Sequence, residues 1–303
     1  MNSQQNRKGH ILAFITIVIW GTTYISTKVL LQSFAPVEIL FIRFVIGLFA
    51  LCIICPHRMR VERKHEKYFV LAGLSGITLY YLFENIALVY TQATNVGVII
   101  SVAPFFTAIL AHIFLKEKKI TRNFILGFII AMLGICLISY NGSTAFALNP
   151  LGDLLALMAA VVWSVYSIVT RKIAELHYDT IQTTRRTFLY GIIFMIPALF
   201  IFGFHPVYTR LLQPVVLLNI LFLGFCACAL CFVTWNMAVK ILGAVKTSIY
   251  IYLVPVITIV TSVLILHEKM NAMSVIGVLC TLTGLFLSGK GKENKGRNRN
   301  ESF

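Results

Sequence analysis

The sequence predicts an all-α integral membrane protein with ten transmembrane helices, arranged as two inverted five-helix repeats. Three observations support this fold class. Of the 303 residues, 58% are hydrophobic and 12% are charged, whereas about a quarter of the residues of a soluble domain are charged. The apolar residues fall into ten runs of about the length that crosses a bilayer as a helix. The second half of the chain also repeats the first half in the same order.

The ten apolar runs define the expected spans. They are continuous and do not alternate with a period of two, which excludes a transmembrane β-barrel. The spacers between them are too short for a sizeable soluble domain. We therefore expect helices at roughly 10–29, 37–55, 68–90, 95–115, 123–140, 151–170, 184–203, 216–239, 246–266 and 272–289.

The first run is expected to be retained as a helix. It follows the basic segment NRKGH and continues into WGTTYISTK. A secretory signal peptide would end in a small-residue cleavage site, which is not found there.

The net charge of +15 follows the predicted topology and does not indicate a nucleic-acid partner. With a cytoplasmic N-terminus, ten spans also place the C-terminus in the cytoplasm. Most Lys and Arg residues then lie on the cytoplasmic side, in segments such as 57–67, 116–122 and 289–300, while Lys28, Arg210 and Lys269 fall outside. Such a bias orients membrane proteins. We expect a multi-pass protein of the cell (inner or plasma) membrane.

The internal repeat sets the domain organisation. A shift of 151 residues superposes Asn85 on Asn236 and Pro104 on Pro255, and a shift of 143 superposes Trp20 on Trp163. We expect one five-helix repeat at 10–140, a second at 151–289, and a basic cytoplasmic tail at 290–303. Because five is odd, the second repeat enters the membrane with opposite polarity, as in many secondary transporters.

Pro104 and Pro255 lie in the middle of the fourth span of each repeat. Proline lacks a backbone donor and clashes with the preceding turn, so it kinks or breaks a helix. This is either a packing kink or a break that faces a cavity. In both cases these spans are expected to line a central cavity.

The third span contains Glu84 and Asn85. Asn85 has a repeat partner in Asn236, which favours a scaffold role, since asparagines hydrogen-bond across membrane helices; contact with substrate is the alternative. Glu84 pairs with Trp235 instead. Tyr80 and Tyr81 lie one helical turn away, so a tyrosine hydroxyl is a candidate partner for one carboxyl oxygen. The carboxyl group is either neutral and hydrogen-bonded between helices, or it faces a cavity and binds a proton or a cationic substrate group.

Arg43 lies within the second span, and its repeat partner is Arg186. Its side chain either reaches back to the interface or to an ion pair at the helix end, or it anchors a substrate carboxylate. The aromatic residues allow two readings as well, packing or a cavity suited to amphipathic solutes. The aromatic candidates are Trp20, Tyr24, Tyr80, Trp163, Tyr166, Trp235, Tyr250 and Tyr252.

No metal or cofactor is expected. Cys52 and Cys55 have metal spacing, as do Cys226, Cys228 and Cys231, but no histidine at mid-span completes either set. A cysteine in lipid behaves as a small hydrophobic residue. No segment matches the phosphate-binding pattern GxxxxGK[ST], so ATP hydrolysis by this chain is not expected.

Several segments resemble the EamA family of the drug/metabolite transporter superfamily. They are WGTTYISTK, APVEILFIRF (35–44), ALVYTQATNVGVIISVAPFFTAILAHIFLKEK (87–118) and the second copy at 238–269. The resemblance implies a ten-helix permease with a central cavity, which is usually an exporter of amino acids, other metabolites or drugs. It implies no role for Glu84.

Together these observations predict a secondary transporter for a small organic solute, with possible proton coupling through Glu84. Two other classes stay open: a membrane receptor or interaction subunit without transport, and an intramembrane enzyme. The enzyme is disfavoured because Glu84 and Arg43 are the only charges well inside the spans, and such chemistry needs converging groups.

Overall fold

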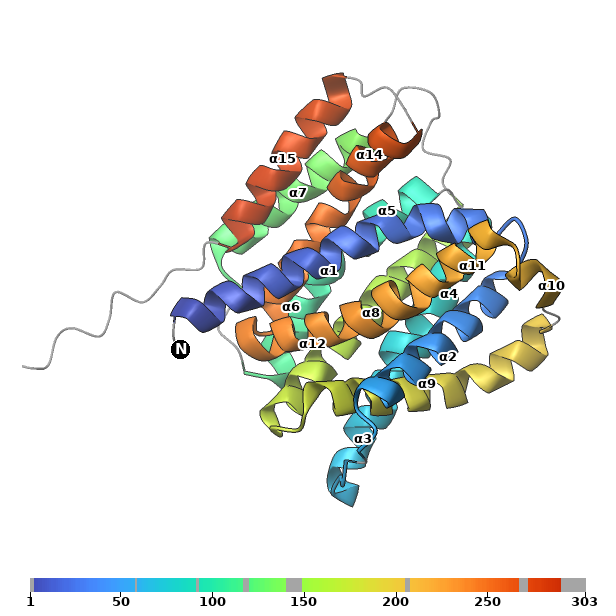
Figure 1. Ribbon diagram of the computed structural model, residues 1–303. Coiled ribbons are helices and arrows are strands. Elements are labelled where there is room, and N and C mark those ends of the chain that lie inside the picture. Colours follow the sequence, from blue (N-terminus) through green and yellow to red (C-terminus); the bar gives the residue numbers. More distant parts are fainter. Residues whose placement is uncertain are drawn as a thin grey trace, which may run out of the picture.

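The computed structural model describes residues 3–57, 59–90, 93–116, 120–139, 149–204, 208–266 and 272–289. The predicted basic tail at 290–303 lies outside the described residues. All secondary-structure elements of the described part are helices, and each of the ten apolar runs folds into one or more of them (Figure 1).

The first repeat contains five spans, two of which are interrupted. They are α1 (Ser3–Leu30), α2 (Pro36–Ile54), the combined span of α3 (Arg63–Ala72), η1 (Gly73–Leu79) and α4 (Tyr80–Tyr90), the pair α5 (Ala93–Ile100) and α6 (Ala103–Phe114), and α7 (Arg122–Ser139).

The second repeat follows the same plan, with the short helix α10 (Tyr208–Leu211) added before its third span. Its spans are α8 (Pro150–Glu175), α9 (Thr180–Phe202), the combined span of α11 (Pro214–Leu221), η2 (Phe222–Leu230) and α12 (Cys231–Leu242), the combined span of α13 (Ala244–Ser248), η3 (Ile249–Tyr252) and α14 (Leu253–Leu266), and α15 (Ala272–Gly289).

The outer surface is that of a membrane protein. Six helical stretches of the described part are long and apolar enough to cross a bilayer, and three further apolar helices are shorter. Large apolar side chains cover the outside of these helices; Phe200 is 84% exposed and Ile201 is 76% exposed. A surface of this kind is stable in lipid and would aggregate in water.

The contact between α7 and α15 shows how the repeats are related. A Cβ atom on Gly127 would lie 2.6 Å from the carbonyl oxygen of Gly284, and one on Gly134 would lie 2.6 Å from that of Gly277. A shift of 150 residues makes Gly277 the repeat partner of Gly127 and Gly284 that of Gly134, so the two contacts exchange on a two-fold rotation. The equivalent helices therefore run antiparallel, which confirms the inverted repeat.

The other spans interlock across the same two-fold relation. Helix α1 packs on α12 and α14 of the second repeat, while α8 packs on α4, α5 and α6 of the first. Likewise α2 packs on η2, and α9 packs on η1. The main hydrophobic core consequently lies between the repeats, not within either of them.

Both third spans contain a π-helical segment at equivalent positions, η1 and η2. Such wide turns are rare and often occur at functional sites. At Gly73 in η1 the backbone approaches that of α9, since a Cβ atom would lie 2.8 Å from the carbonyl oxygen of Thr187. Both wide turns thus lie at close approaches between the repeats.

The predicted irregularity at the two prolines is confirmed. Helix α5 ends at Ile100 and α6 begins at Ala103, so Pro104 lies in the first turn of a new helix. In the second repeat the 3₁₀ segment η3 precedes α14, whose first turn contains Pro255. The hydroxyl of Ser164 in α8 donates to the carbonyl oxygen of Ala103 at 2.9 Å and ties the break to the neighbouring repeat.

The glycine contact between α7 and α15 gives a stability prediction. In Gly284→Ala the new Cβ atom would lie 2.4 Å from the backbone nitrogen of Ala131, so the two helices must separate. We expect a loss of about 1–3 kcal/mol of stability, seen as a lower apparent melting temperature of the detergent-purified protein. Gly289→Ala, on the same helix but with open space around the new Cβ atom, is the control; equal melting temperatures for the two variants would contradict this packing.

Candidate functional site

A cavity of about 80 Å³ lies between the two repeats. Helices of both repeats line it, including both interrupted fourth spans. The lining residues are Trp20, Thr23, Thr27, Arg43, Tyr80, Tyr81, Glu84, Asn85, Gly97, Ile100, Ser101, Trp163, Ile251 and Val254.

Arg43 of α2 is buried and lies on this cavity. Its Nε donates to the Sγ atom of Cys228 at 3.1 Å, and its guanidinium carbon lies 4.5 Å from the ring centroid of Tyr81. A cation above an aromatic face is stabilised by the ring quadrupole. These contacts hold the guanidinium inside the protein, so Arg43 does not reach back to the membrane interface.

Glu84 of α4 is also buried and lines the same cavity. The hydroxyl of Tyr80, one helical turn earlier, donates to Oε1 of Glu84 at 3.3 Å. The expectation that a nearby tyrosine serves this carboxyl group is therefore confirmed. The structure also places the carboxyl group at the cavity, which the sequence could not do.

Arg43 and Glu84 interact electrostatically but do not touch. In the part of the chain that the structure describes, no ion pair within 4.0 Å joins them. A buried charge is costly unless it is paired or hydrogen-bonded. Two opposite charges that share one cavity without contact leave room for a ligand or water between them.

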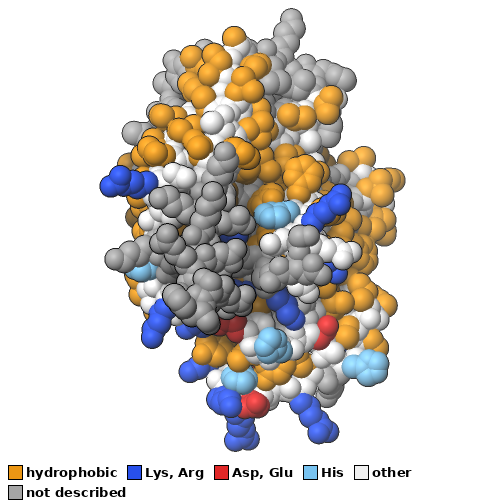
Figure 2. Space-filling view, turned by 90° about the vertical axis from the view of Figure 1, so that its left-hand side faces the viewer, with side chains coloured by type: hydrophobic (Ala, Val, Ile, Leu, Met, Phe, Trp, Pro, Cys, Tyr) orange, Lys and Arg blue, Asp and Glu red, His pale blue; other side chains and the backbone are white. Residues whose placement is uncertain are grey.

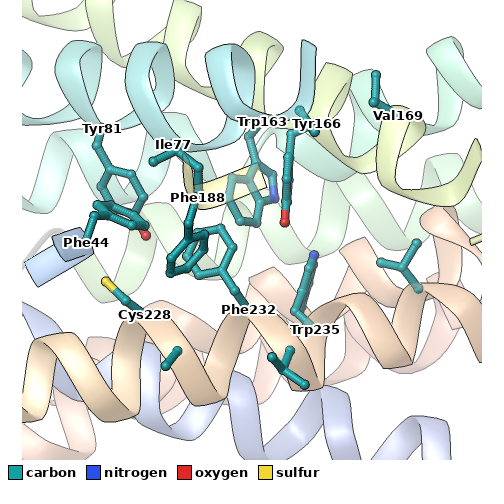
Figure 3. Packing of buried hydrophobic residues seen from close by; sticks show 14 of the residues in the cluster. Phe44, Ile77, Tyr81, Trp163, Tyr166, Val169, Phe188, Cys228, Phe232 and Trp235 are labelled. Atoms are coloured by element: carbon teal, nitrogen blue, oxygen red, sulfur yellow. The ribbon is translucent and has the colours of Figure 1, made fainter. Parts of the chain in front are cut away.

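Aromatic rings enclose the cavity. The ring centroids of Trp20 and Trp163, which are repeat partners, lie 5.4 Å apart, and Tyr80 lies 4.8 Å from Trp163. Trp235 packs behind Trp20 at 5.2 Å. Figure 3 shows Trp163 and Tyr166 facing Trp235 and Phe232 across the core. The cavity lining therefore combines two charges with four aromatic side chains, those of Trp20, Tyr80, Tyr81 and Trp163.

Three buried polar atoms near this core have no hydrogen-bond partner among the described residues: the indole Nε1 atoms of Trp163 and Trp235, and the hydroxyl oxygen of Tyr252. Buried polar groups are normally satisfied by protein or by ordered water. Trp163 lines the cavity, so its indole ring is in reach of a ligand there.

The predicted site residues divide into two groups. The cavity lining includes Trp20, Arg43, Tyr80, Tyr81, Glu84, Asn85 and Trp163. The lining as drawn from the described residues does not include Pro104, Trp235, Asn236, Tyr252 or Pro255. Trp235 and Tyr252 pack in the core, and the two prolines lie in the first turns of α6 and α14. Tyr250 bonds His10 away from the cavity, and the side chain of Tyr24 lies outside the described residues.

Asn85 and Asn236 differ although the repeat makes them equivalent. The Oδ1 atom of Asn236 accepts from the hydroxyl of Tyr166 at 3.0 Å, and its Nδ2 donates to the hydroxyl of Thr184 at 3.1 Å. Asn236 thus joins three helices. Asn85, in contrast, lies at the cavity surface.

Sequence reasoning missed three polar lining residues, Thr23, Thr27 and Ser101. Threonine and serine are common packing residues in membrane helices, so their type alone gives no signal. Their positions in the sequence give a signal for two of them. Ser101 lies in the turn before Pro104, and Thr27 is the repeat partner of Thr170.

The sequence profile of the EamA-like transporter family matches residues 7–140 and again 150–289. The two matches together cover almost the whole chain. The chain belongs to the EamA-like transporter family. This EamA-like protein is therefore a multi-pass membrane transporter with a small-molecule substrate, and not an enzyme.

Several relatives match this EamA-like transporter over most of its length. An uncharacterized transporter of Archaeoglobus fulgidus is 28% identical over 93% of this chain and 98% of its own length. YyaM, an uncharacterized transporter of Bacillus subtilis, is 28% identical over 88% of this chain and 89% of its own. A probable terminal-alkyne amino-acid exporter of Streptantibioticus cattleyicolor is 26% identical over 95% of both chains.

The fold is shared with a solved structure. A protein crystal structure superposes with a TM-score of 0.76 and covers 95% of this chain and 97% of its own. Its sequence is 19% identical, so this likeness concerns the fold alone.

Proposed function

We propose that this EamA-like transporter is a secondary transporter that exports a small zwitterionic organic solute, such as an amino acid or a related metabolite, by alternating access. The observation that carries the proposal is the pair of buried, oppositely charged side chains Arg43 and Glu84, which line one cavity without forming an ion pair with each other.

The two charges match the two ends of a zwitterion. A substrate carboxylate accepts hydrogen bonds from the Arg43 guanidinium, whose planar fork suits bidentate binding of a carboxylate. A substrate ammonium group lies against the Glu84 carboxylate. Both buried charges are then neutralised at once, which offsets the desolvation of the solute.

The aromatic enclosure suits the rest of the solute. Trp20, Trp163 and Tyr80 line the cavity, and aromatic rings bind apolar side chains and attract cations. The relative described as a probable terminal-alkyne amino-acid exporter supports a zwitterion with an apolar side chain. An amphipathic drug-like cation would use the rings and Glu84 but not Arg43.

The proposed orientation has both termini in the cytoplasm of a cell with this protein in its inner or plasma membrane. The basic clusters at 57–67 and 116–122 then lie inside, as the positive-inside bias requires. Figure 2 views the end of the molecule that bears the N-terminus, and Lys, Arg and His side chains are spread over the middle and lower part of this face, among apolar side chains.

Energy comes from a gradient in this proposal, either of the solute or of protons. Glu84 is the proton site: it binds a proton in the absence of the ammonium group and releases it when the solute binds. Ionisable residues inside membrane spans commonly form such relays. Inverted repeats supply two conformations of similar energy for alternating access.

Metabolite analysis tests the proposal. Cells with and without the protein are compared, and solutes that accumulate inside the deletion strain are candidates for export. Each candidate is then tested by exchange in proteoliposomes that contain the purified protein. We expect zwitterions to dominate the exchanged solutes. If folded protein exchanges no solute from a broad metabolite panel, the receptor alternative is correct.

A further inference from the structure

Two small hollows lie at opposite ends of the helix bundle. One, called here the outer hollow, has a volume of about 60 Å³ and is lined by Thr27, Leu31, Pro36, Ile39, Arg43, Asn85 and Val89. The other, the inner hollow, has about 20 Å³ and is lined by Thr170, Ile173, Ala174, Tyr178, Thr180, Thr183, Thr187, Asn236 and Lys240.

The two hollows are related by the repeat. The 143-residue shift carries Thr27 to Thr170 and Leu31 to Ala174, and the 151-residue shift carries Asn85 to Asn236 and Val89 to Lys240. The 143-residue shift carries the remaining outer residues, at 36, 39 and 43, to positions next to the inner lining residues Thr180, Thr183 and Thr187 of α9. The hollows are therefore the same structural feature, present once on each side of the membrane.

Their connection to the central cavity differs. The outer hollow shares Thr27, Arg43 and Asn85 with the cavity, so the two spaces adjoin. The inner hollow shares no lining residue with it in the described part of the chain.

A set of three hydrogen-bonded residues separates the inner hollow from the cavity. Asn236 of α12 bonds both Tyr166 of α8 and Thr184 of α9. The Tyr166 ring lies 5.1 Å from that of Trp163, which forms the cavity wall (Figure 3). Tyr166 and Thr184 are fully buried.

We propose that the inner hollow is the cytoplasmic entrance for the solute, and that Tyr166, Asn236 and Thr184 form the gate between this entrance and the central site. The inference rests on the proposed export function. The solute class is the same zwitterion: the Lys240 ammonium group at the hollow receives its carboxylate before the gate opens. The structure is then the state that is closed to the cytoplasm.

The equivalent set cannot form on the outer side. The repeat partner of Thr184 is Phe41, which has no hydroxyl group, and that of Tyr166 is Thr23. The hydroxyl of Thr23 donates to the carbonyl oxygen of Trp20 in its own helix at 2.7 Å. The two sides are therefore closed by different contacts, and the gate variants act on one side only.

Thiol accessibility tests the gate. Ser101→Cys places a thiol in the central cavity, where Ser101 lies. A membrane-impermeant thiol reagent is applied to inside-out and right-side-out vesicles, and modification at position 101 is followed by peptide mass spectrometry. Thr184→Val and Tyr166→Phe each remove one hydroxyl with little change in shape. We expect each to raise the modification rate from the cytoplasmic face about three- to tenfold, because one hydrogen bond that holds the gate is lost.

Thr183→Val is the matched control. Thr183 also lines the inner hollow, but its hydroxyl donates to the Thr180 carbonyl oxygen of its own helix. We expect no change in cytoplasmic modification with this variant. An equal increase for Thr183→Val, or no increase for both gate variants, would overturn the gate.

The experiment needs no transported solute, so it is independent of the proposed function. If the gate variants behave as expected but no zwitterion is exchanged, the gate stands and the substrate assignment fails. If zwitterions are exchanged while the gate variants leave the accessibility of position 101 unchanged, the substrate assignment stands and the gate fails.

Discussion

Arg43→Gln is expected to raise the KM for zwitterionic solutes by at least about 30-fold, with folded protein retained. The guanidinium is buried, lies over Tyr81 and donates through Nε to Cys228, so no other described cation of the cavity lining replaces it. Removal of one partner from a buried charged contact costs about 2–5 kcal/mol. Glutamine keeps a polar group of similar length but cannot neutralise a carboxylate. The KM is measured by exchange in proteoliposomes.

Arg186→Gln is the matched control for this variant. Arg186 is the repeat partner of Arg43, but its Nε and Nη2 atoms bond the Glu66 carboxylate at 2.8 Å, away from the central cavity. We expect its KM to change by less than about threefold. If both arginine variants raise KM equally, or if neither does, Arg43 does not bind the solute.

Glu84→Gln is expected to abolish the pH dependence of transport and to weaken the binding of solutes that carry an ammonium group by about tenfold or more. Glutamine has the same shape and can still accept the hydrogen bond from Tyr80, but it carries no charge and binds no proton. A lost charged contact costs about 1.5–3 kcal/mol. Initial exchange rates across a pH series measure both effects.

Glu38→Gln controls for the loss of a buried carboxylate in the same repeat. The Oε2 atom of Glu38 accepts from the backbone N–H of Ala35 at 2.8 Å, at the start of α2. Glutamine also serves in this capping position. The pH profile is therefore expected to stay as in the wild type. A Glu84→Gln protein with unchanged rate and pH profile would remove Glu84 from the proposed site.

The repeat made the fold predictable from the sequence. Ten apolar runs gave the spans, and an odd number of helices in each repeat required inversion; the exchanged contacts of Gly127 and Gly134 bear this out. The π-helical turns at η1 and η2 were not predictable, because they depend on how closely the two repeats approach and not on the residues of one helix.

Part of the site was predictable for the same reason. Glu84 stood out because its repeat partner is a tryptophan, and it lies on the cavity. Comparison of the repeats did not predict that Asn85 and Asn236 differ in their surroundings. Asn236 bonds Tyr166 and Thr184, whereas Asn85 lines the cavity. A comparison of one residue with its repeat partner does not show how the neighbouring side chains differ. The different connections of the two hollows to the cavity could therefore be seen only in the structure.

We propose that Arg43 and Glu84 bind the two charges of one solute. Competition with single-charge analogues tests it most directly. Proteoliposomes that exchange an amino acid are challenged with that amino acid, with its methyl ester, which lacks the carboxylate, and with its N-acetyl form, which lacks the ammonium group. We expect each analogue to compete at least about 30-fold more weakly than the parent zwitterion. Equal competition by either analogue would contradict it.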